Sequence, residues 1–172
     1  MTSIIKANES HAQLLSDLAS STFIESHGHS AKPEDINSYV SEKYNEDVLR
    51  NELRDPGNIY HILFYNNQAA GYSKIILNAP HSNIGTQNVA KIERIYLLKE
   101  FYNLNLGSEL FQFNLNIIRA NNQAGIWLFV WTENPRAINF YKKNGFTIIG
   151  SNDFKISENH SNPNYQMYLS LT

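Results

Sequence analysis

The sequence contains no cysteine. Disulfide bonds, zinc–thiolate sites and cysteine nucleophiles are therefore excluded, and any group transfer must proceed without a protein thiol. No apolar run approaches the roughly 20 residues that a membrane-spanning helix needs, and the polar residues that begin at Lys6 leave no signal peptide. The net charge of −2 gives no general attraction to nucleic acid or to anionic membranes. We expect a soluble, cytoplasmic protein with neither of these partners.

The composition is that of a folded chain. Of the 172 residues, 42% are hydrophobic and 17% are charged, so the chain has enough apolar surface to bury in a core. The length suits a single domain that spans residues 1–172. No internal repeat, low-complexity segment or linker divides it.

Apolar periodicity predicts a helical first third followed by a β-rich remainder. We expect a strand over 2–6, a helix reaching about residue 27, a helix from Pro33 and a further turn or helix around Val48. After a break at 55–58, the pattern predicts strands over 59–65, 69–77 and 89–98, a helix over 104–120, a strand over 126–131, a helix over 135–144, and strands near 145–154 and 164–171.

The order of these elements predicts a fold class. The segments 89–98, 104–120 and 126–131 form a βαβ unit, so the two strands should be parallel, with a right-handed crossover. The hairpin around residues 66–68 and the two C-terminal strands should pair antiparallel. The prediction is an α/β fold, or α+β in some classifications, with a mixed central sheet and helices on both faces.

One short helix carries the strongest functional pattern. Asn134 suits the N-cap of this helix, Pro135 its first position and Gly145 its C-terminal cap. Any short helix could use these residues, but here they surround Tyr141 directly after a strongly apolar strand. The run Asn-Pro-Arg-Ala-Ile-Asn-Phe-Tyr-Lys-Lys-Asn-Gly-Phe at 134–146 resembles the second half of the cofactor site of GCN5-related (GNAT) N-acetyltransferases.

The resemblance implies the GNAT fold, in which the two parallel strands are splayed apart, and acetyl-CoA as co-substrate without a metal. It implies that Tyr141 is the acid that returns a proton to the leaving thiolate, with a buried structural tyrosine as the alternative. It also implies that Asn134, Arg136 and Lys143 contact the cofactor.

Backbone groups of the 89–98 strand have implied roles as well. In the family, the cofactor arm pairs with free groups that correspond to Ile95 and Leu97, and the Leu97 N–H stabilises the developing oxyanion. For the base that takes the proton of the amine we propose Glu93, which period-2 alternation places on the same strand face as Ile95 and Leu97. The alternative, held equal, is that Glu93 pairs with Arg94, Lys91 or another cation.

The turn before the 104–120 helix corresponds to the family's pyrophosphate-binding turn. The family pattern is Gln or Arg, two residues, Gly, one residue, then Gly or Ala; here Tyr102, Asn105 and Gly107 stand in those places, and only Gly107 matches. Asn tolerates positive φ, so Asn105 can still permit the turn. By itself the segment could be an ordinary strand-to-helix loop. The residues expected to bind the cofactor here are Tyr102, Asn103, Leu104, Asn105, Leu106, Gly107 and Ser108.

The acceptor is less clearly encoded. Residues 25–55 hold eight acidic and four basic residues, a local charge of −4 that favours a cationic acceptor, although solvated helix faces explain it too. Segments such as 22–26, 71–74 and 92–97 resemble the bacterial polyamine (spermidine/spermine) N-acetyltransferase branch. We expect Glu25, His27 and Tyr96 to contact a small-molecule amine.

The histidines do not indicate a metal site. His27 and His29 are placed in a loop that faces solvent or substrate, and the six histidines form no metal-binding pattern. A homodimer is an open expectation. The alternatives to a small-molecule acetyltransferase are a coenzyme-A-binding module with little or no turnover, and an enzyme that acetylates a protein or peptide amine.

Overall fold

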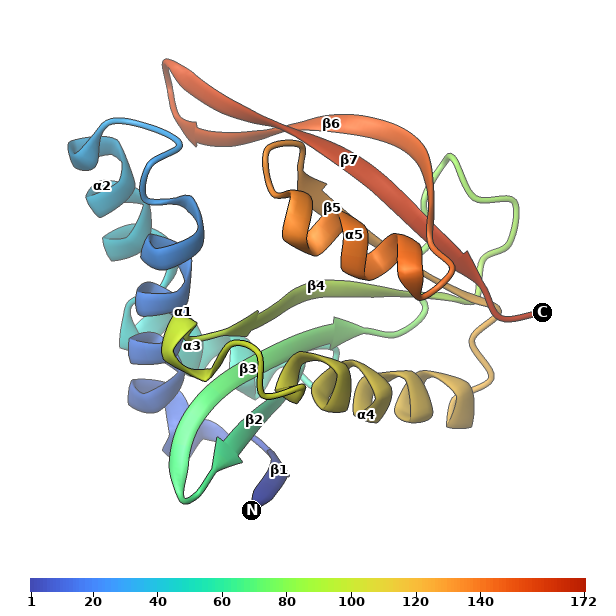
Figure 1. Cartoon of the computed structure of the whole chain (residues 1–172), viewed down its shortest axis with the longest axis horizontal. Helices are drawn as coiled ribbons and strands as arrows, with labels where there is room; N and C mark the ends of the chain where they lie inside the picture. Colours follow the sequence, from blue (N-terminus) through green and yellow to red (C-terminus); the bar gives the residue numbers. More distant parts are fainter. The chain divides into compact units, whose positions relative to one another are not determined.

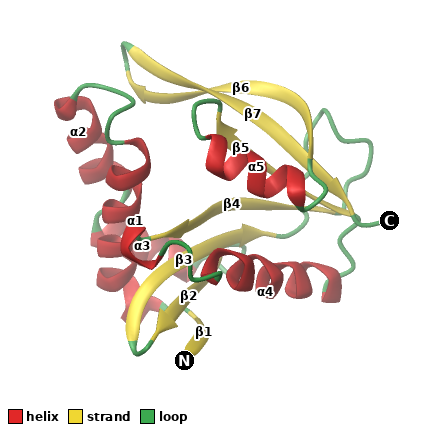
Figure 2. Ribbon diagram, viewed as in Figure 1, coloured by secondary structure: helices red, strands yellow, loops and turns green.

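The computed structural model describes residues 1–172, and Figure 2 shows its helices and strands. The elements are β1 (Thr2–Lys6), η1 (Glu9–His11), α1 (Ala12–His27), α2 (Pro33–Lys43), α3 (Glu46–Arg54), β2 (Ile59–Tyr65), β3 (Gln68–Ile76), β4 (Val89–Leu97), η2 (Lys99–Phe101), α4 (Leu106–Ala120), β5 (Gly125–Trp131), α5 (Pro135–Lys143), β6 (Thr147–Ser157) and β7 (His160–Ser170). None of the helices combines the length and apolar character needed to cross a membrane.

The strands form one mixed sheet in the order β1-β2-β3-β4-β5-β7-β6, with helices on both faces. β1–β2, β2–β3, β5–β7 and β6–β7 pair antiparallel, and β4–β5 pair parallel, which confirms the predicted fold class and strand directions. The β4–β5 ladder joins residues 89–91 to 125–127 and does not continue to Ile92 and Glu93, although both strands go on.

The chain divides into two compact units. Unit 1 contains residues 1–75 and 94–114, and unit 2 contains residues 76–93 and 115–172, so β4 and α4 contribute residues to each. In unit 1, α1 packs against α2 and α3 (blue to cyan in Figure 1). A separate apolar cluster joins β2, β3 and the start of α4; its buried members are Leu63, Ala70, Phe101, Leu106 and Leu110.

Unit 2 is built on β5, β7 and β6, which form the antiparallel C-terminal part of the sheet (orange to red in Figure 1). The loop 79–88 is fastened to this sheet, because the Trp127 Nε1 donates to the Ala79 carbonyl at 2.7 Å and Ile84 packs beside Val89 and Trp127. The apolar strand at 125–131 is almost entirely buried, as its sequence predicted.

Most predicted boundaries lie within one or two residues of the observed ones, and the largest difference is in the β6–β7 hairpin. The β6–β7 hairpin continues to Ser157 and resumes at His160, although its outer part is too polar to show strand periodicity. α4 begins at Leu106, and Leu104 is 44% exposed in the preceding turn. The hairpin turn between β2 and β3 is confirmed, since Asn66 and Asn67 have φ of 48° and 65°, the signs that a tight type I′ turn requires.

Candidate active site

The turn between β4 and α4 contains a row of backbone amides without partners. The Tyr102 N–H closes η2 on the Lys99 carbonyl at 3.0 Å, and the Glu109 N–H opens the α4 ladder on the Asn105 carbonyl at 3.2 Å. Between these bonds, the N–H groups of residues 103–108 donate no hydrogen bond. Unpaired amides at the start of a 15-residue helix concentrate positive partial charge, so this turn is chemically suited to an anion.

Two asparagines shape this turn. Asn103 and Asn105 have φ of 65° and 62°, in the left-handed region. The prediction that Asn105 can replace a glycine at a positive-φ position is therefore confirmed. Gly107 has a different role, because a Cβ there would meet only Leu97 Cδ1, at an ordinary 3.6 Å. The fold does not need glycine at this position, whereas a ligand that approaches the backbone closely would.

The end of β4 lies beside this turn. Ile95 and Leu97 pack their side chains against the cluster that contains Leu106 and Leu110. The Leu98 N–H is bound to the Ala70 carbonyl of β3 at 2.9 Å. Because successive N–H groups of a strand point to opposite edges, the N–H groups of Ile95 and Leu97 point away from β3. This is the edge that the predicted cofactor contacts require.

Gly71 is the residue that lets β3 approach β4 so closely. A Cβ at Gly71 would lie 2.4 Å from the Tyr96 carbonyl oxygen and 2.5 Å from Leu97 Cδ2. Backbone atoms cannot move aside as a flexible side chain can, so only glycine fits here. The position of the Leu97 backbone thus depends on a residue of the neighbouring strand.

Unit 2 holds the predicted catalytic tyrosine on α5. The Asn134 Oδ1 accepts the Ala137 N–H at 3.2 Å, Pro135 opens the helix, and Gly145 follows it with φ of 93°, so the predicted caps are confirmed. A Cβ at Gly145 would stand 3.2 Å from Leu169 Cδ1. Tyr141 lies between these caps, and its side chain is 8% exposed.

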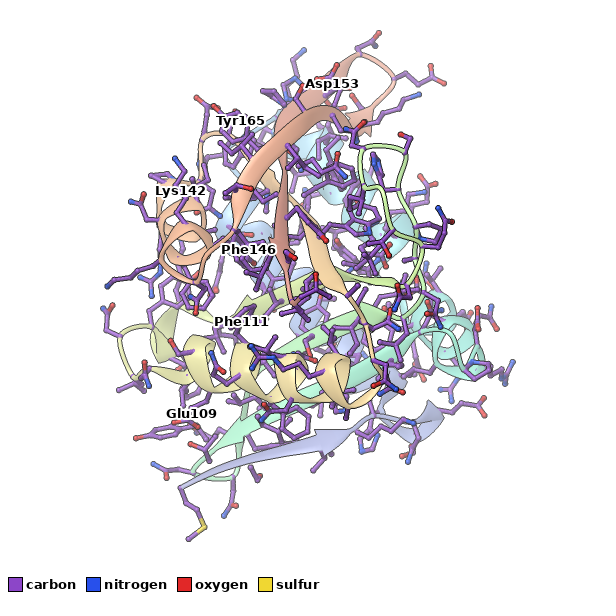
Figure 3. The ribbon with its side chains drawn as sticks, turned by 90° about the vertical axis from the view of Figure 1, so that its right-hand side faces the viewer. Glu109, Phe111, Lys142, Phe146, Asp153 and Tyr165 are labelled. Atoms are coloured by element: carbon purple, nitrogen blue, oxygen red, sulfur yellow. The ribbon has the colours of Figure 1, made fainter.

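The ring of Tyr141 is held by aromatic neighbours. Its centroid lies 5.4 Å from that of Phe146 and 5.5 Å from that of Phe140, and the Phe146 N–H is bound to the Tyr141 carbonyl at 3.0 Å. Arg136 and Lys143 are exposed on the same helix, as is Lys142, which Figure 3 labels together with Phe146. The side-chain amide of Asn134 donates no hydrogen bond, so this group remains available to a ligand.

Glu93 forms an ion pair with Lys91, as the alternative to its role as base predicted. Its carboxylate lies 3.6 Å from Lys91 Nζ, and the two side chains are 28% and 21% exposed. Lys91 Nζ also lies over the rings of Trp127 and Phe129, at 4.9 and 5.5 Å from their centroids. The ion pair with Lys91 and the proposed role of Glu93 as base are compatible, so Glu93 stays the candidate for that role.

The expected acceptor residues have more structural contacts than the sequence suggested. Glu25 Oε2 accepts the Lys99 N–H at 2.8 Å, which ties α1 to the turn before α4. The prediction that His27 lies in a loop is wrong. His27 is the last residue of α1, and only 8% of it is exposed. Its ring stacks on Phe23 and meets the ring of Tyr96 edge-on at 6.2 Å. These tertiary contacts bury a residue whose sequence neighbours are polar.

Burial changes the protonation of His27. Desolvation, helped by the charge of His29, lowers the pKa of His27 to about 4, so the imidazole is neutral at neutral pH. Ser26 Oγ donates to the Thr22 carbonyl and lies 2.6 Å from His27 Nδ1. The Ser26 hydroxyl and His27 Nδ1 therefore share a hydrogen bond, whose direction depends on the tautomer of the ring.

The sequence did not reveal that an arginine of β4 is largely enclosed in unit 1. Arg94 Nη1 donates to the Tyr60 hydroxyl at 2.8 Å and lies 3.5 Å from Glu52 Oε2, and the guanidinium lies 4.9 Å from the centroid of Tyr44. Glu52 also accepts from the Tyr60 hydroxyl and from Lys74 Nζ at 3.3 Å. We call these five residues the arginine cluster. Its members come from segments that are distant in the sequence. The only sequence signal was the period-2 alternation of β4, which places Arg94 and Tyr96 on the same face of the strand.

Burial also sets the protonation of Tyr44 in this cluster and of two tyrosines near it. It raises the pKa of Tyr44, Tyr72 and Tyr96, and the charge of Arg94 offsets only part of that effect. The pKa of Arg94 itself is raised, because burial lowers it less than the surrounding tyrosines and Glu52 raise it. These hydroxyls are therefore neutral donors and acceptors, and the arginine is the fixed charge among them.

Three of the eight acidic residues in the segment 25–55 pair with cations of unit 1. Glu46 pairs with Arg50, Glu42 with Lys43, and Glu52 with Lys74 and Arg94. These contacts favour the interpretation of this segment as ordinary solvated helix faces.

Sequence and structure comparisons agree on the class of protein. The acetyltransferase (GNAT) family model matches residues 14–146. An uncharacterized N-acetyltransferase in the pepI 3′ region of Lactobacillus delbrueckii subsp. lactis is 30% identical over 155 residues, which cover 90% of each chain. The chain therefore belongs to the GNAT acetyltransferase family, and it is an acyltransferase.

Two solved structures show how closely the fold is shared. The PaiA N-acetyltransferase of Thermoplasma acidophilum, crystallised with coenzyme A, has a TM-score of 0.77 at 20% identity, over 99% of both chains. The ribosomal-protein-S18-alanine N-acetyltransferase of Escherichia coli has a TM-score of 0.68 at 16% identity, over 100% of this chain and 95% of that one. At these identities, the likeness is one of fold.

Proposed function

We propose that the protein transfers the acetyl group of acetyl-CoA to a primary amine by direct attack within a ternary complex. The observation that carries this proposal is the run of unpaired amides at 103–108 at the start of α4. It extends the family assignment to a cofactor because such a run suits the pyrophosphate of coenzyme A. We also propose that both units act as one acetyltransferase domain over residues 1–172.

The residues present fit this cofactor. The amides of 103–108, with Tyr102 before them, would hold the pyrophosphate, and the edge of β4 at Ile95 and Leu97 would pair with the cofactor arm. Asn134, through its unused side-chain amide, and the exposed cations Arg136 and Lys143 would contribute from α5. When bound, acetyl-CoA supplies an acetyl thioester, whose carbonyl carbon is the electrophile.

The reaction forms one C–N bond and breaks one C–S bond, and it must move two protons. An ammonium group has a pKa of about 10.4, so it must lose a proton before its nitrogen can attack. We assign that step to Glu93, and the return of a proton to the sulfur to the Tyr141 hydroxyl. The Leu97 N–H would stabilise negative charge on the acyl oxygen. No acyl-enzyme is needed, in keeping with a chain that has no cysteine.

The acceptor suggested by resemblance is a polyamine, with Glu25, His27 and Tyr96 as contacts. Glu25 accepts a backbone N–H, and three of the eight acidic groups of 25–55 pair with cations, so these groups already have partners within the protein. Polyamines are therefore tested as one class of acceptor among several classes of amine. An amine on a peptide or protein is another arm.

A second candidate is a coenzyme-A-binding module with little turnover. The observation that favours it is the chemistry of residues 102–108, which include no charged side chain where the family pattern has Gln or Arg. Binding without transfer would be the expected behaviour of such a module. A cytoplasmic location and a homodimer remain predictions from the sequence.

Calorimetry with coenzyme A, followed by a thiol-release assay with acetyl-CoA and an amine panel, tests the proposal. The panel contains spermidine, ω-amino acids, dipeptides and a lysine-containing peptide. We expect micromolar binding and thiol release that depends on the amine. Binding without release on any amine would favour the module, and absence of binding would overturn the cofactor assignment.

A further inference from the structure

The guanidinium of Arg94 is fixed on one side and open on the other. Nη1 donates to the Tyr60 hydroxyl and faces Glu52, while one face of the group lies over the ring of Tyr44. Nε and Nη2 donate to no group of the protein. Neither atom is sealed from solvent, although the side chain as a whole is only 15% exposed.

This arrangement leaves the Nε–Nη2 edge of the guanidinium without an acceptor. Those two N–H groups are parallel, and their spacing matches the two oxygens of a carboxylate. An arginine that served only to neutralise Glu52 would gain most from directing this edge at the carboxylate. Instead, a single nitrogen faces Glu52, at 3.5 Å. Tyr60 and Tyr44 hold the group in that orientation, so little side-chain entropy is lost when a ligand binds.

We infer that the amine acceptor carries a carboxylate, and that the Nε–Nη2 edge of Arg94 binds it. The inference rests on the proposed acetyltransferase function and specifies its substrate class. It replaces a purely cationic acceptor with one that has an amine at one end and an anion at the other. The neutral hydroxyls of Tyr72 and Tyr96 line the same region of unit 1, since Tyr72 contacts the rings of both Tyr60 and Tyr96.

The position of Arg94 on β4 also limits the length of the acceptor. Leu97, whose N–H is assigned to the acyl oxygen, is three residues further along the strand, which is about 10 Å at the usual rise per residue. From this backbone separation we expect an acceptor whose amine and carboxylate are separated by several atoms. ω-Amino acids, dipeptides and the side-chain amine of lysine meet this condition, whereas the α-amine of a free amino acid is too close to its carboxylate.

Matched amines that differ only in the carboxylate provide the test, with no mutation required. ω-Aminohexanoate is compared with hexylamine, lysine with cadaverine, and glycylglycine with glycylglycinamide, each as kcat/KM for acetyl-CoA-dependent thiol release. We expect the carboxylate-bearing member to be preferred by at least about tenfold, since a bidentate pair makes two charge-assisted hydrogen bonds, each roughly twice as strong as a neutral one. Equal use of both members, or preference for cadaverine and spermidine, would overturn the inference while leaving the acetyltransferase function intact.

Variants then assign the preference to Arg94. Arg94→Gln should reduce the ratio within each pair to near one, through a rise in KM for the carboxylate-bearing member, and Arg94→Lys should restore it only in part because lysine has no fork. Arg50→Gln is the matched control, because it removes an arginine of the same unit that binds Glu46, and its ratios should equal those of wild type. A ratio that Arg94→Gln leaves unchanged would place the carboxylate elsewhere. Absence of thiol release with every amine would count against the acetyltransferase function itself.

Discussion

The carbonyl of Asn105 accepts the N–H of Glu109, and this 3.2 Å bond marks where the ladder of α4 begins. Every amide from residue 103 to residue 108 lies before the first residue that donates into that ladder. The backbone amides of the turn therefore all remain able to donate, even though Tyr102 and Asn105 stand where the family pattern has Gln or Arg and its first glycine. Backbone geometry, more than side-chain identity, should determine affinity for the cofactor here.

A charge placed at Gly107 should separate stability from binding. Gly107→Asp adds an acid to the first turn of α4, which the helix dipole favours by about 0.3–1 kcal/mol, and there is room for the Cβ 3.6 Å from Leu97 Cδ1. The melting temperature should be unchanged or higher. Affinity for coenzyme A, measured by calorimetry, should fall at least about tenfold through repulsion of the pyrophosphate. The isosteric Gly107→Asn controls for size and should bind much more tightly than the Asp variant; equal affinities would refute the placement of the phosphate.

The left-handed residues of the turn can be tested by unfolding. Asn103→Ala and Asn105→Ala should each lower the free energy of unfolding by about 1 kcal/mol, because alanine adopts positive φ at a higher cost than asparagine. Asn105→Gly should retain both stability and affinity for coenzyme A. Denaturant titration measures the first quantity and calorimetry the second. A glycine variant that binds much more tightly than wild type would mean that Asn105 weakens the cofactor site.

Removal of the Tyr141 hydroxyl should affect turnover much more than cofactor affinity. Tyr141→Phe should lower kcat by about 10²-fold or more, the usual contribution of a positioned acid, and leave the Kd for coenzyme A within about twofold. The ring still fits between Phe140 and Phe146, so the fold should be preserved. Tyr65→Phe, at the β2–β3 hairpin, is the control and should be neutral. If affinity and turnover fell together in Tyr141→Phe, the hydroxyl would be structural.

His61 should make the fold sensitive to acid. Burial, with the charge of Lys6, lowers the pKa of His61 to about 4 from its ordinary 6.5, and no hydrogen bond is made by its Nδ1. The unfolded state therefore takes up this proton before the folded state does. The contribution of His61 is fully present above pH 6.5 and is lost as pH falls toward 4, by about 3 kcal/mol in total.

His61→Phe should reduce this pH dependence. The new ring can keep the edge contact with Phe113, now 4.9 Å from the imidazole centroid, and it does not titrate. The difference in unfolding free energy between pH 7 and pH 4, measured in urea, should shrink by about 3 kcal/mol. A His160→Asn variant in the β6–β7 hairpin should keep the wild-type difference. The same difference in both variants would contradict the role of His61.

Sequence predicted α5 and its caps well because every signal for that helix is local. Asn134, Pro135 and Gly145 act on their own neighbours, so their effect does not depend on the rest of the fold. The same holds for the asparagine turn at 66–67 and for the positive φ of Asn105. The outer part of the β6–β7 hairpin was missed because cross-strand pairing, and not apolar alternation, forms it.

The arginine cluster could not be predicted in the same way. Glu52, Tyr60, Lys74 and Arg94 lie on four different elements, and no fixed spacing connects them. Arg94 looked like a surface partner for Glu93, yet the structure gives it Tyr60 and Glu52. His27 was misplaced for a related reason, since its burial depends on Phe23 and Tyr96 and not on its polar sequence neighbours.

The two caps of α5 limit which insertions and deletions this site can tolerate. Asn134 fixes the first turn of the helix, and Gly145 fixes its last, because any side chain there would meet both an unfavourable φ and Leu169. The direction in which the Tyr141 hydroxyl points then depends on the number of residues between Tyr141 and each fixed end of the helix. One inserted or deleted residue would turn it by about 100° around the helix axis. The exposed face of α5 has room for substitutions, whereas a change in the length of the helix would move the Tyr141 hydroxyl away from its present direction.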